Sequence, residues 1–224
     1  MRLLALDTSS LACTVGVQTE AGVFVKHEER PREHTRLLMP MIRGVLEEAD
    51  VDLADLDGIV LGNGPGSFIG MRIAASVAQG LAAGSGLRIA AVSSLAAVAH
   101  TVIESGGETI AVAQDAHMQQ VYLGLFAVRE KRIATLGVER LQDCTAIEEL
   151  GKLRDCVAAG YGWQRYPALL EANRHHIAAV SDTLYPHASA LLALGVAAFE
   201  RDEGLAPEML VPAYLRQKVA EIPR

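Results

Sequence analysis

The stretch "LALDTSSLACTVGV", Leu4 to Val17, combines an apolar strand that ends in Asp7, a small polar turn and a second strand that contains Gly16. The stretch "VAQDAHMQQVYLGL", Val112 to Leu125, has the same order of features. In both, the glycine stands nine positions after the aspartate. This repeat predicts two lobes that each open with a strand, an acidic turn and a second strand.

A duplication of this kind is typical of the α/β fold of actin-like ATPases and sugar kinases, in which the two acidic turns face each other across a cleft. We therefore predict a two-lobed fold of the actin and RNase H-like type, with two βββαβα lobes. The run "SGGE" at 105–108 separates the lobes, so we expect an N-terminal lobe over 1–105 and a C-terminal lobe over 106–224. The tail from Leu210 onward carries two prolines, and we expect it to lie extended and to pack back on the first lobe.

Hydrophobic periodicity predicts the individual elements. We expect strands at 2–6, 13–19, 22–28, 58–62, 88–92, 132–138 and 156–160. We expect helices at 35–49, 67–83, 94–104, 163–172 and 187–200.

Composition and charge exclude several classes of protein. Half of the 224 residues are hydrophobic, which is typical of a globular chain rather than a disordered one. The net charge of −7 argues against binding of nucleic acid by the chain alone. No apolar run is long enough to span a membrane, so we expect a cytoplasmic protein. The three cysteines are far apart and are expected to be buried thiols.

The glycine-rich run "LGNGPGSFIGMR", 61–72, resembles a phosphate-binding loop but lacks its chemistry. A P-loop needs a lysine after its last glycine, and no lysine occurs between Lys26 and Lys131. A dinucleotide fingerprint needs glycine where Ser67 stands. We interpret the run as a tight turn, shaped for backbone packing, that leads into a helix capped by Ser67.

Asp7 and Asp115 are the strongest candidates for acid chemistry, because each follows an apolar strand. With Ser9 and Ser10 they define a candidate cleft that faces a nucleotide or a partner. The alternative, which we favour, is that each aspartate caps its own turn. The histidines do not have the helical H-x-x-x-H spacing of a metal site, since His34 is followed four residues later by Leu38. We predict no metal ion and no catalytic residue.

Two consecutive helices carry stripes that predict a partner surface. We expect this surface to be formed by Leu38, Met41, Ile42 and Val45 of the first helix and Gly70, Ala74 and Val77 of the second. Small residues on the second helix would let another helix approach closely. In the absence of the partner, the same surface is expected to pair with itself in a symmetric dimer.

Five segments resemble the TsaB family, formerly called YeaZ, and they occur in the family's order. They are "LALDTSSLACTVGV", "HTRLLMPMI", "LGNGPGSFIGMRI", "DAHMQQVY" and "PAYLR", and together they span Leu3 to Arg216. The resemblance implies the actin-like two-lobed fold that the internal repeat also predicts.

The resemblance also implies a function in making N6-threonylcarbamoyladenosine next to the anticodon of tRNAs. In that reaction TsaB supports the catalytic paralogue TsaD, alongside TsaE and TsaC. TsaD carries an H-x-x-x-H metal pair, and this chain has Leu38 where the second histidine would stand. The resemblance therefore implies a non-catalytic subunit that binds TsaD and TsaE and contacts tRNA only through the complex. It implies no cofactor for the isolated chain, and ATP with Mg²⁺ only within the complex. The competing interpretation is an active actin-like ATPase or phosphotransferase that uses Asp7 and Asp115.

Overall fold

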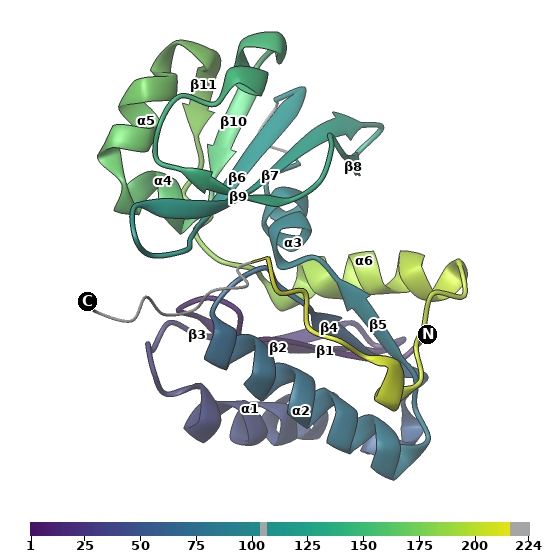
Figure 1. Cartoon of the computed structure of the whole chain (residues 1–224). Coiled ribbons are helices and arrows are strands. Elements are labelled where there is room, and N and C mark those ends of the chain that lie inside the picture. Colours follow the sequence, from purple (N-terminus) through teal and green to yellow (C-terminus); the bar gives the residue numbers. More distant parts are fainter. Residues whose placement is uncertain (104–106, 216–224) are drawn as a thin grey trace, which may run out of the picture.

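The computed structural model describes residues 1–103 and 107–215 as two lobes, one above the other in Figure 1. The boundary predicted between residues 105 and 106 lies outside the described residues. No helix within the described ranges is long and apolar enough to cross a membrane.

The lower lobe in Figure 1 is built on a five-stranded sheet with the strand order β3-β2-β1-β4-β5. β1 pairs antiparallel with β2 and parallel with β4, while β3 and β5 form the edges. Its strands are β1 (Leu3–Asp7), β2 (Cys13–Gln18), β3 (Val23–Glu28), β4 (Gly58–Gly62) and β5 (Ile89–Val92).

The upper lobe repeats this topology on a six-stranded sheet. Its main path, read from the other end, is β8-β7-β6-β10-β11, with antiparallel pairing up to β6 and parallel pairing beyond it. The strands are β6 (Thr109–Asp115), β7 (Gln120–Arg129), β8 (Arg132–Thr135), β9 (Arg140–Asp143), β10 (Cys156–Ala159) and β11 (Ile177–Val180). β9 pairs with β7 beside this path. The duplication predicted from the Asp and Gly repeat is thus confirmed.

Helices cover both faces of the lower sheet because the side chains of its strands alternate between two cores. Leu4 and Leu6 of β1 face the core beneath α1 (His34–Glu48) and α2 (Phe68–Ser85). Leu3 and Ala5 face the core beneath α6 (Ala188–Glu200) on the opposite side. Figure 1 shows α1 and α2 below this sheet and α6 above it.

The helices α3 (Ser94–Thr101) and α6 each pack on the sheet of the other half of the sequence. Leu95 and Val98 of α3 join the core formed by Ile110 and Phe126 of the upper sheet. Leu191 and Leu192 of α6 join the core of the lower sheet. The chain therefore crosses between the lobes before each of these helices, so the lobes are not simple sequence halves.

The segment predicted as one helix over 163–172 forms two short helices, α4 (Tyr161–Arg165) and α5 (Pro167–Asn173). Pro167 has no amide hydrogen to donate and disfavours helical backbone at Tyr166, so the helix cannot continue. The strands β9 and β11 were not predicted, because each is short and lacks a clear apolar alternation. Cys13 and Cys156 are buried as predicted, whereas Cys144 is only half-buried.

The residues predicted to form a partner surface lie instead in the core of the lower lobe. Leu38, Met41, Ile42, Val45, Gly70 and Ala74 are buried, and Val77 is half-buried against the same core. Each helix turns its apolar stripe toward the sheet, because this removes the most apolar surface from water. The assignment of these stripes to an exposed surface was wrong.

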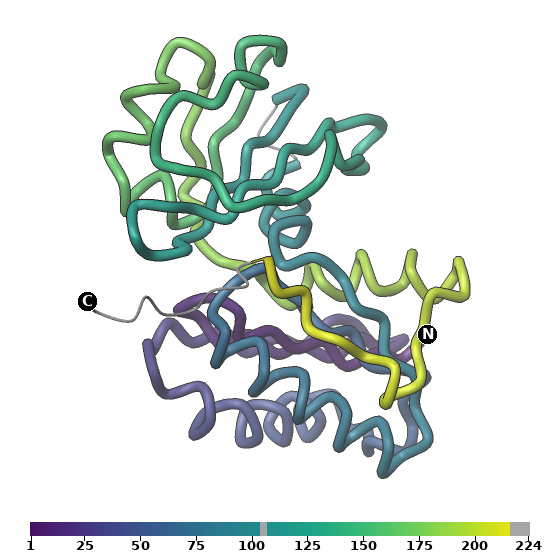
Figure 2. Tube along the Cα trace, viewed as in Figure 1, coloured from purple at the N-terminus to yellow at the C-terminus, as the bar shows by residue number. Residues whose placement is uncertain are grey.

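The segment after α6 returns along the lower lobe, beside β5 and α2 (Figure 2). Leu205 bridges to Ile89 of β5, which covers part of an edge strand. The Gln79 side chain of α2 donates a hydrogen bond to the Pro207 carbonyl at 2.9 Å. Part of the predicted extended tail, 216–224, lies outside the described residues.

Candidate functional site

The glycine-rich loop 62–67 is packed against the turn that follows β1. The Ser67 amide donates to the Ser9 carbonyl at 2.6 Å, and the Thr8 hydroxyl donates to the Gly70 carbonyl at 2.6 Å. A Cβ added at Gly66 would overlap the Ser9 carbonyl, and one at Gly70 would overlap the Thr8 carbonyl. The glycines therefore permit close backbone packing, as the sequence indicated.

The N-terminus of α2 is also as predicted, since the Ser67 hydroxyl caps it by accepting from the Gly70 amide at 3.3 Å. The Ser67 amide and the Gly70 amide are thereby both engaged inside the protein. Fewer free backbone amides therefore remain at the start of α2 to bind a phosphate.

Asp7 is buried behind the loop, where its carboxylate fastens three segments together. Its Oδ1 accepts from the Ser9 amide at 2.6 Å, and its Oδ2 accepts from the Ser94 hydroxyl at 2.5 Å. The Ser94 oxygen in turn accepts from the Gly64 amide of the loop at 2.9 Å. Burial raises the pKa of Asp7 to about 6, although both hydrogen bonds oppose this. Asp7 thus caps its own turn and ties α3 to the loop.

Asp115 caps the corresponding turn of the upper lobe. Its Oδ1 accepts from the His117 amide at 2.8 Å and from the Tyr166 hydroxyl at 2.7 Å. Burial, together with the hydrogen bond to Asp115, raises the pKa of Tyr166 to about 12, so the hydroxyl remains a donor at neutral pH. The capping interpretation is confirmed for both aspartates.

A cleft of about 1060 Å³ lies between the two acidic turns. Ser9 and Ser10 line it from the lower lobe, and Asp115 to Met118 line it from the upper lobe. Three of the four predicted cleft residues, Ser9, Ser10 and Asp115, therefore meet there. Asp7 is not part of the lining, because it points into the protein toward Ser94.

Aromatic side chains also line the cleft, and no sequence pattern predicted that they would meet there. Four of the five tyrosines of the chain line the cleft, and they come from four separate segments: Tyr122, Tyr161, Tyr185 and Tyr214. Phe68, at the start of α2, joins them. Their spacing along the chain carries no periodic signal, so only the folded structure brings them together.

His34 begins α1 and also lines the cleft. It is buried, and its Nε2 has no hydrogen-bond partner. Leu38, one turn further on, faces the apolar core and offers no ligand atom. Within the described residues, no group of three or more His, Cys, Asp or Glu side chains is arranged to hold a metal ion.

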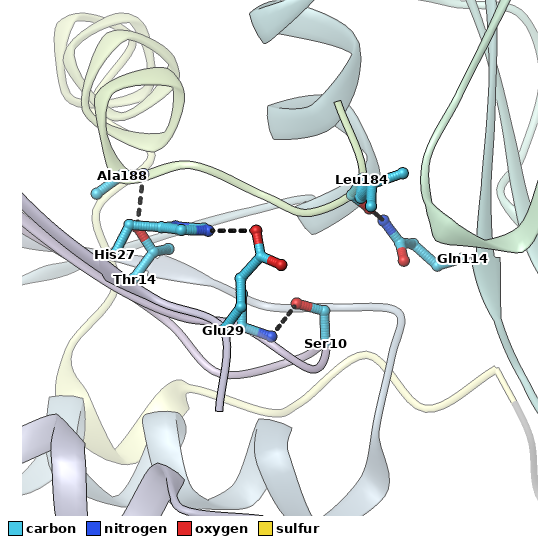
Figure 3. A network of polar contacts seen from close by, with 8 residues as sticks. Ser10, Thr14, His27, Glu29, Gln114, Leu184 and Ala188 are labelled. Carbon is cyan, nitrogen blue, oxygen red and sulfur yellow. Dashed lines mark hydrogen bonds and ion pairs between the residues drawn. The ribbon is translucent and has the colours of Figure 1, made fainter. Parts of the chain in front are cut away.

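The second crossing between the lobes, residues 181–187, contributes Tyr185 to the cleft lining. Polar contacts of this crossing are drawn in Figure 3. The Gln114 side chain donates to the Leu184 carbonyl at 2.6 Å, and the Ala188 amide donates to the Thr14 hydroxyl at 3.1 Å. His27 lies 3.7 Å from a Glu29 carboxylate oxygen, and its ring is 5.2 Å from that of His187. The crossing is thus held by polar contacts to both lobes.

Two lobes of one topology, facing each other through equivalent acidic turns, define a protein of the actin-like ATPase fold class. The family model described as TsaD, tRNA N6-adenosine threonylcarbamoyltransferase, matches residues 19–224.

Relatives match over nearly the whole chain. The tRNA threonylcarbamoyladenosine biosynthesis protein TsaB of Escherichia coli is 32% identical, and the match covers 98% of this chain and 96% of that protein. TsaB of Haemophilus influenzae is also 32% identical over 98% of this chain and 95% of its own length. A solved structure of YeaZ from Pseudomonas aeruginosa is 37% identical, with a TM-score of 0.84, covering 96% of this chain and 99% of that one. The chain belongs to the TsaB (YeaZ) family.

Proposed function

We propose that this chain is a non-catalytic subunit that binds TsaD and supports it in making N6-threonylcarbamoyladenosine next to the anticodon of tRNAs. The observation that carries the proposal is the match to TsaB relatives over nearly the full length of both proteins. In this proposal TsaE completes the assembly, tRNA and ATP with Mg²⁺ are bound only within the complex, and the protein acts in the cytoplasm.

The geometry of the two aspartates supports a non-catalytic role. Asp7 is outside the cleft lining and its two oxygens are engaged by Ser9 and Ser94. Asp115 is at the cleft, but it is engaged by its own turn and by Tyr166. A phosphotransferase that used both carboxylates would need them to converge on one bound metal or nucleophile. The ATPase alternative therefore has less structural support.

We propose as the partner surface the outer face of α1 and α2, the side turned away from the sheet. The exposed residues of these two helices include Arg36, Pro40 and Arg43 of α1 and Ser76, Gly80, Ala83 and Gly84 of α2. A Cβ added at Gly80 or Gly84 would meet no other atom within 4 Å. The small residues therefore leave room for a helix of a partner to approach closely.

The same outer face would serve a homodimer when TsaD is absent. A two-fold axis lets one surface act as its own partner, and the two helices from each chain would then form a four-helix contact. TsaD and a second copy of this chain would compete for that face.

Gly80→Arg tests the surface, because a long charged side chain would occupy the space that the partner helix needs. The matched control is Ala193→Arg, which places the same side chain on an exposed position of α6, across the sheet. We expect Gly80→Arg to lose TsaD in a pull-down and to sediment as a monomer, and Ala193→Arg to behave as the parent chain. A folded Gly80→Arg chain, judged by circular dichroism, that still captures TsaD would place the interface elsewhere.

Reconstitution tests the function itself. TsaC, TsaD, TsaE, ATP and tRNA are combined with and without this chain, and the modified nucleoside is quantified after digestion. We expect modification to depend on the chain, whereas the chain alone should not hydrolyse ATP. Modification that proceeds equally without it, or Mg²⁺-dependent ATP turnover by the isolated chain that is abolished by Asp115→Asn, would overturn the proposal.

A further inference from the structure

A second cavity, of about 560 Å³, opens at the end of the upper sheet that is turned away from the cleft. Its lining includes Thr109, where β6 begins, Arg129, where β7 ends, and residues 152–154, which precede β10. β6 runs from this cavity to Asp115 at the cleft, and its length of 7 residues separates the two ends by roughly 20 Å. This cavity is therefore distinct from the cleft.

Cationic side chains from separate segments line this second cavity. Among the described lining residues, Arg129, Lys152 and Arg154 carry a positive charge and Glu108 carries a negative one. All three cationic residues are exposed to solvent. Within the described ranges, none of the three side chains is held by an ion pair or by a hydrogen bond to another side chain. The cavity thus offers cations that no protein carboxylate engages.

The charge of the cavity is opposite to that of the chain as a whole. The chain has a net charge of −7, whereas cations outnumber carboxylates among the described lining residues. Glu104 lies outside the described residues, close in sequence to Glu108, and the cations still outnumber the carboxylates when its charge is added. An anion that approaches this chain is therefore attracted most readily to a local site of this kind.

Backbone contacts hold the segments of the cavity in place. The Thr109 hydroxyl donates to the Arg154 carbonyl at 2.9 Å, and the Val128 amide donates to the Glu108 carbonyl at 2.9 Å. Apolar residues that are buried or half-buried form the rest of the lining: Ala127, Val128, Leu136 and Leu153. Apolar walls have a low dielectric constant, so they strengthen the attraction between the cations and an anionic ligand.

The cavity and the proposed partner surface do not overlap. The outer face of α1 and α2 lies below the lower sheet, whereas the cavity belongs to the upper lobe (Figure 1). One chain can therefore contact TsaD through the two helices while the cavity contacts another molecule.

We propose that this cavity binds a phosphate group of the tRNA backbone when the chain is part of the TsaD complex. Arginine binds phosphate oxygens through paired hydrogen bonds, and lysine adds a point charge. Such contacts position an RNA without reading its bases. The inference rests on the proposed function, in which tRNA binds only within the complex, because one cationic cavity on a chain of net charge −7 gives little affinity by itself.

Binding of a tRNA transcript to the complex of this chain with TsaD and TsaE tests the proposal, measured by fluorescence anisotropy at several salt concentrations. Lys152→Gln and Arg154→Gln each remove one cation of the cavity, and Arg174→Gln removes an exposed cation of the same lobe outside the lining. We expect each cavity variant to weaken binding roughly fivefold at about 0.15 M salt and to lower the slope of log Kd against log salt by about one. Cavity variants that bind like the parent, or like Arg174→Gln, would overturn the proposal.

Glu108→Gln gives a test of opposite sign, because it removes the described carboxylate of the lining. We expect this variant to bind tRNA more tightly than the parent, a gain that a damaged fold would not produce. The matched control is Glu171→Gln, at an exposed position of α5 outside the lining, which should bind like the parent. Unchanged or weaker binding by Glu108→Gln would overturn the proposal.

Titration of the complex with sodium pyrophosphate separates the tRNA backbone from a small phosphate compound. Pyrophosphate binding that Arg154→Gln abolishes, together with unchanged tRNA binding, would assign the cavity to a small compound and overturn the proposal. A pull-down of TsaD by each variant separates this inference from the proposed function. A chain that captures TsaD but whose tRNA affinity ignores the cavity refutes this inference alone, whereas a parent chain that does not capture TsaD refutes both.

Discussion

Asp7→Asn removes the buried carboxyl group that joins the β1 turn, the glycine loop and α3. The residue is 1% exposed, and its two oxygens accept from Ser9 and Ser94. Asparagine has nearly the same shape, so the variant changes the charge while disturbing the packing little. It therefore tests whether burial outweighs the hydrogen bonds in setting the pKa of Asp7.

Burial raises the pKa of Asp7 from 3.8 to about 6. The folded chain then binds more protons than the unfolded chain between these values, so the contribution of Asp7 to stability is complete at low pH and is lost as the pH rises to about 6. Each pKa unit corresponds to about 1.4 kcal/mol, so the loss is on the order of 3 kcal/mol. Because asparagine does not titrate, the variant does not lose this stability as the pH rises.

The measurement is urea unfolding of the parent and the variant at several pH values between about 4 and 7.5. Unfolding is monitored by circular dichroism and by the fluorescence of Trp163. Burial also lowers the pKa of His100 and of His187, and such groups lower stability as the pH falls. The difference between variant and parent removes these shared contributions. Asp50→Asn, at an exposed position, controls for the loss of one negative charge.

We expect the free energy of unfolding of Asp7→Asn, relative to the parent, to rise by about 2 to 3 kcal/mol across this range. A constant offset at all pH values is compatible with the reasoning, because it reflects lost hydrogen bonds. A relative stability that is flat, or that falls as the pH rises, would show that the bonds from Ser9 and Ser94 outweigh burial, and the reasoning would be refuted.

Four further substitutions test the packing around the loop and α2, each by thermal and urea unfolding. Gly70→Ala should lower the stability by about 1 to 3 kcal/mol, because the added Cβ overlaps a backbone carbonyl. Gly80→Ala lies in open space on the same helix and should raise the stability by about 0.5 to 1 kcal/mol. Equal effects of the two substitutions would contradict the close packing at Gly70. Ser94→Ala should cost about 1 to 3 kcal/mol, because the Gly64 amide loses its acceptor and the Asp7 carboxylate keeps the Ser9 amide but loses the donor on its Oδ2. A neutral result would mean that water replaces the hydroxyl. Ala74→Arg should lower stability by more than about 3 kcal/mol, since the position is fully buried, and a fully stable variant would show that this side of α2 is not core.

The architecture could be predicted from the amino-acid sequence, because the relevant signals are local. The Asp and Gly repeat at Asp7 and Asp115 predicted two equivalent lobes, and the two sheets have the same topology. The turn chemistry of both aspartates and the cap at Ser67 depend on atoms within a few residues of each other. Pro167 is the exception among the local signals, since it stood inside an otherwise helical pattern and was overlooked.

Which helix faces are buried, and which distant side chains meet, could not be predicted without the folded structure. The helix stripes through Leu38 and Ala74 would be apolar whether they packed on a sheet or on a partner, because both arrangements remove the same apolar surface from water. Hydrophobic periodicity therefore cannot distinguish a core from an interface. The cleft is assembled from Tyr122, Tyr161 and Tyr185 of one half of the sequence and from a tail that folds back to bring Tyr214 beside Phe68. Such long-range contacts depend on how the lobes and the tail pack, which no local pattern encodes.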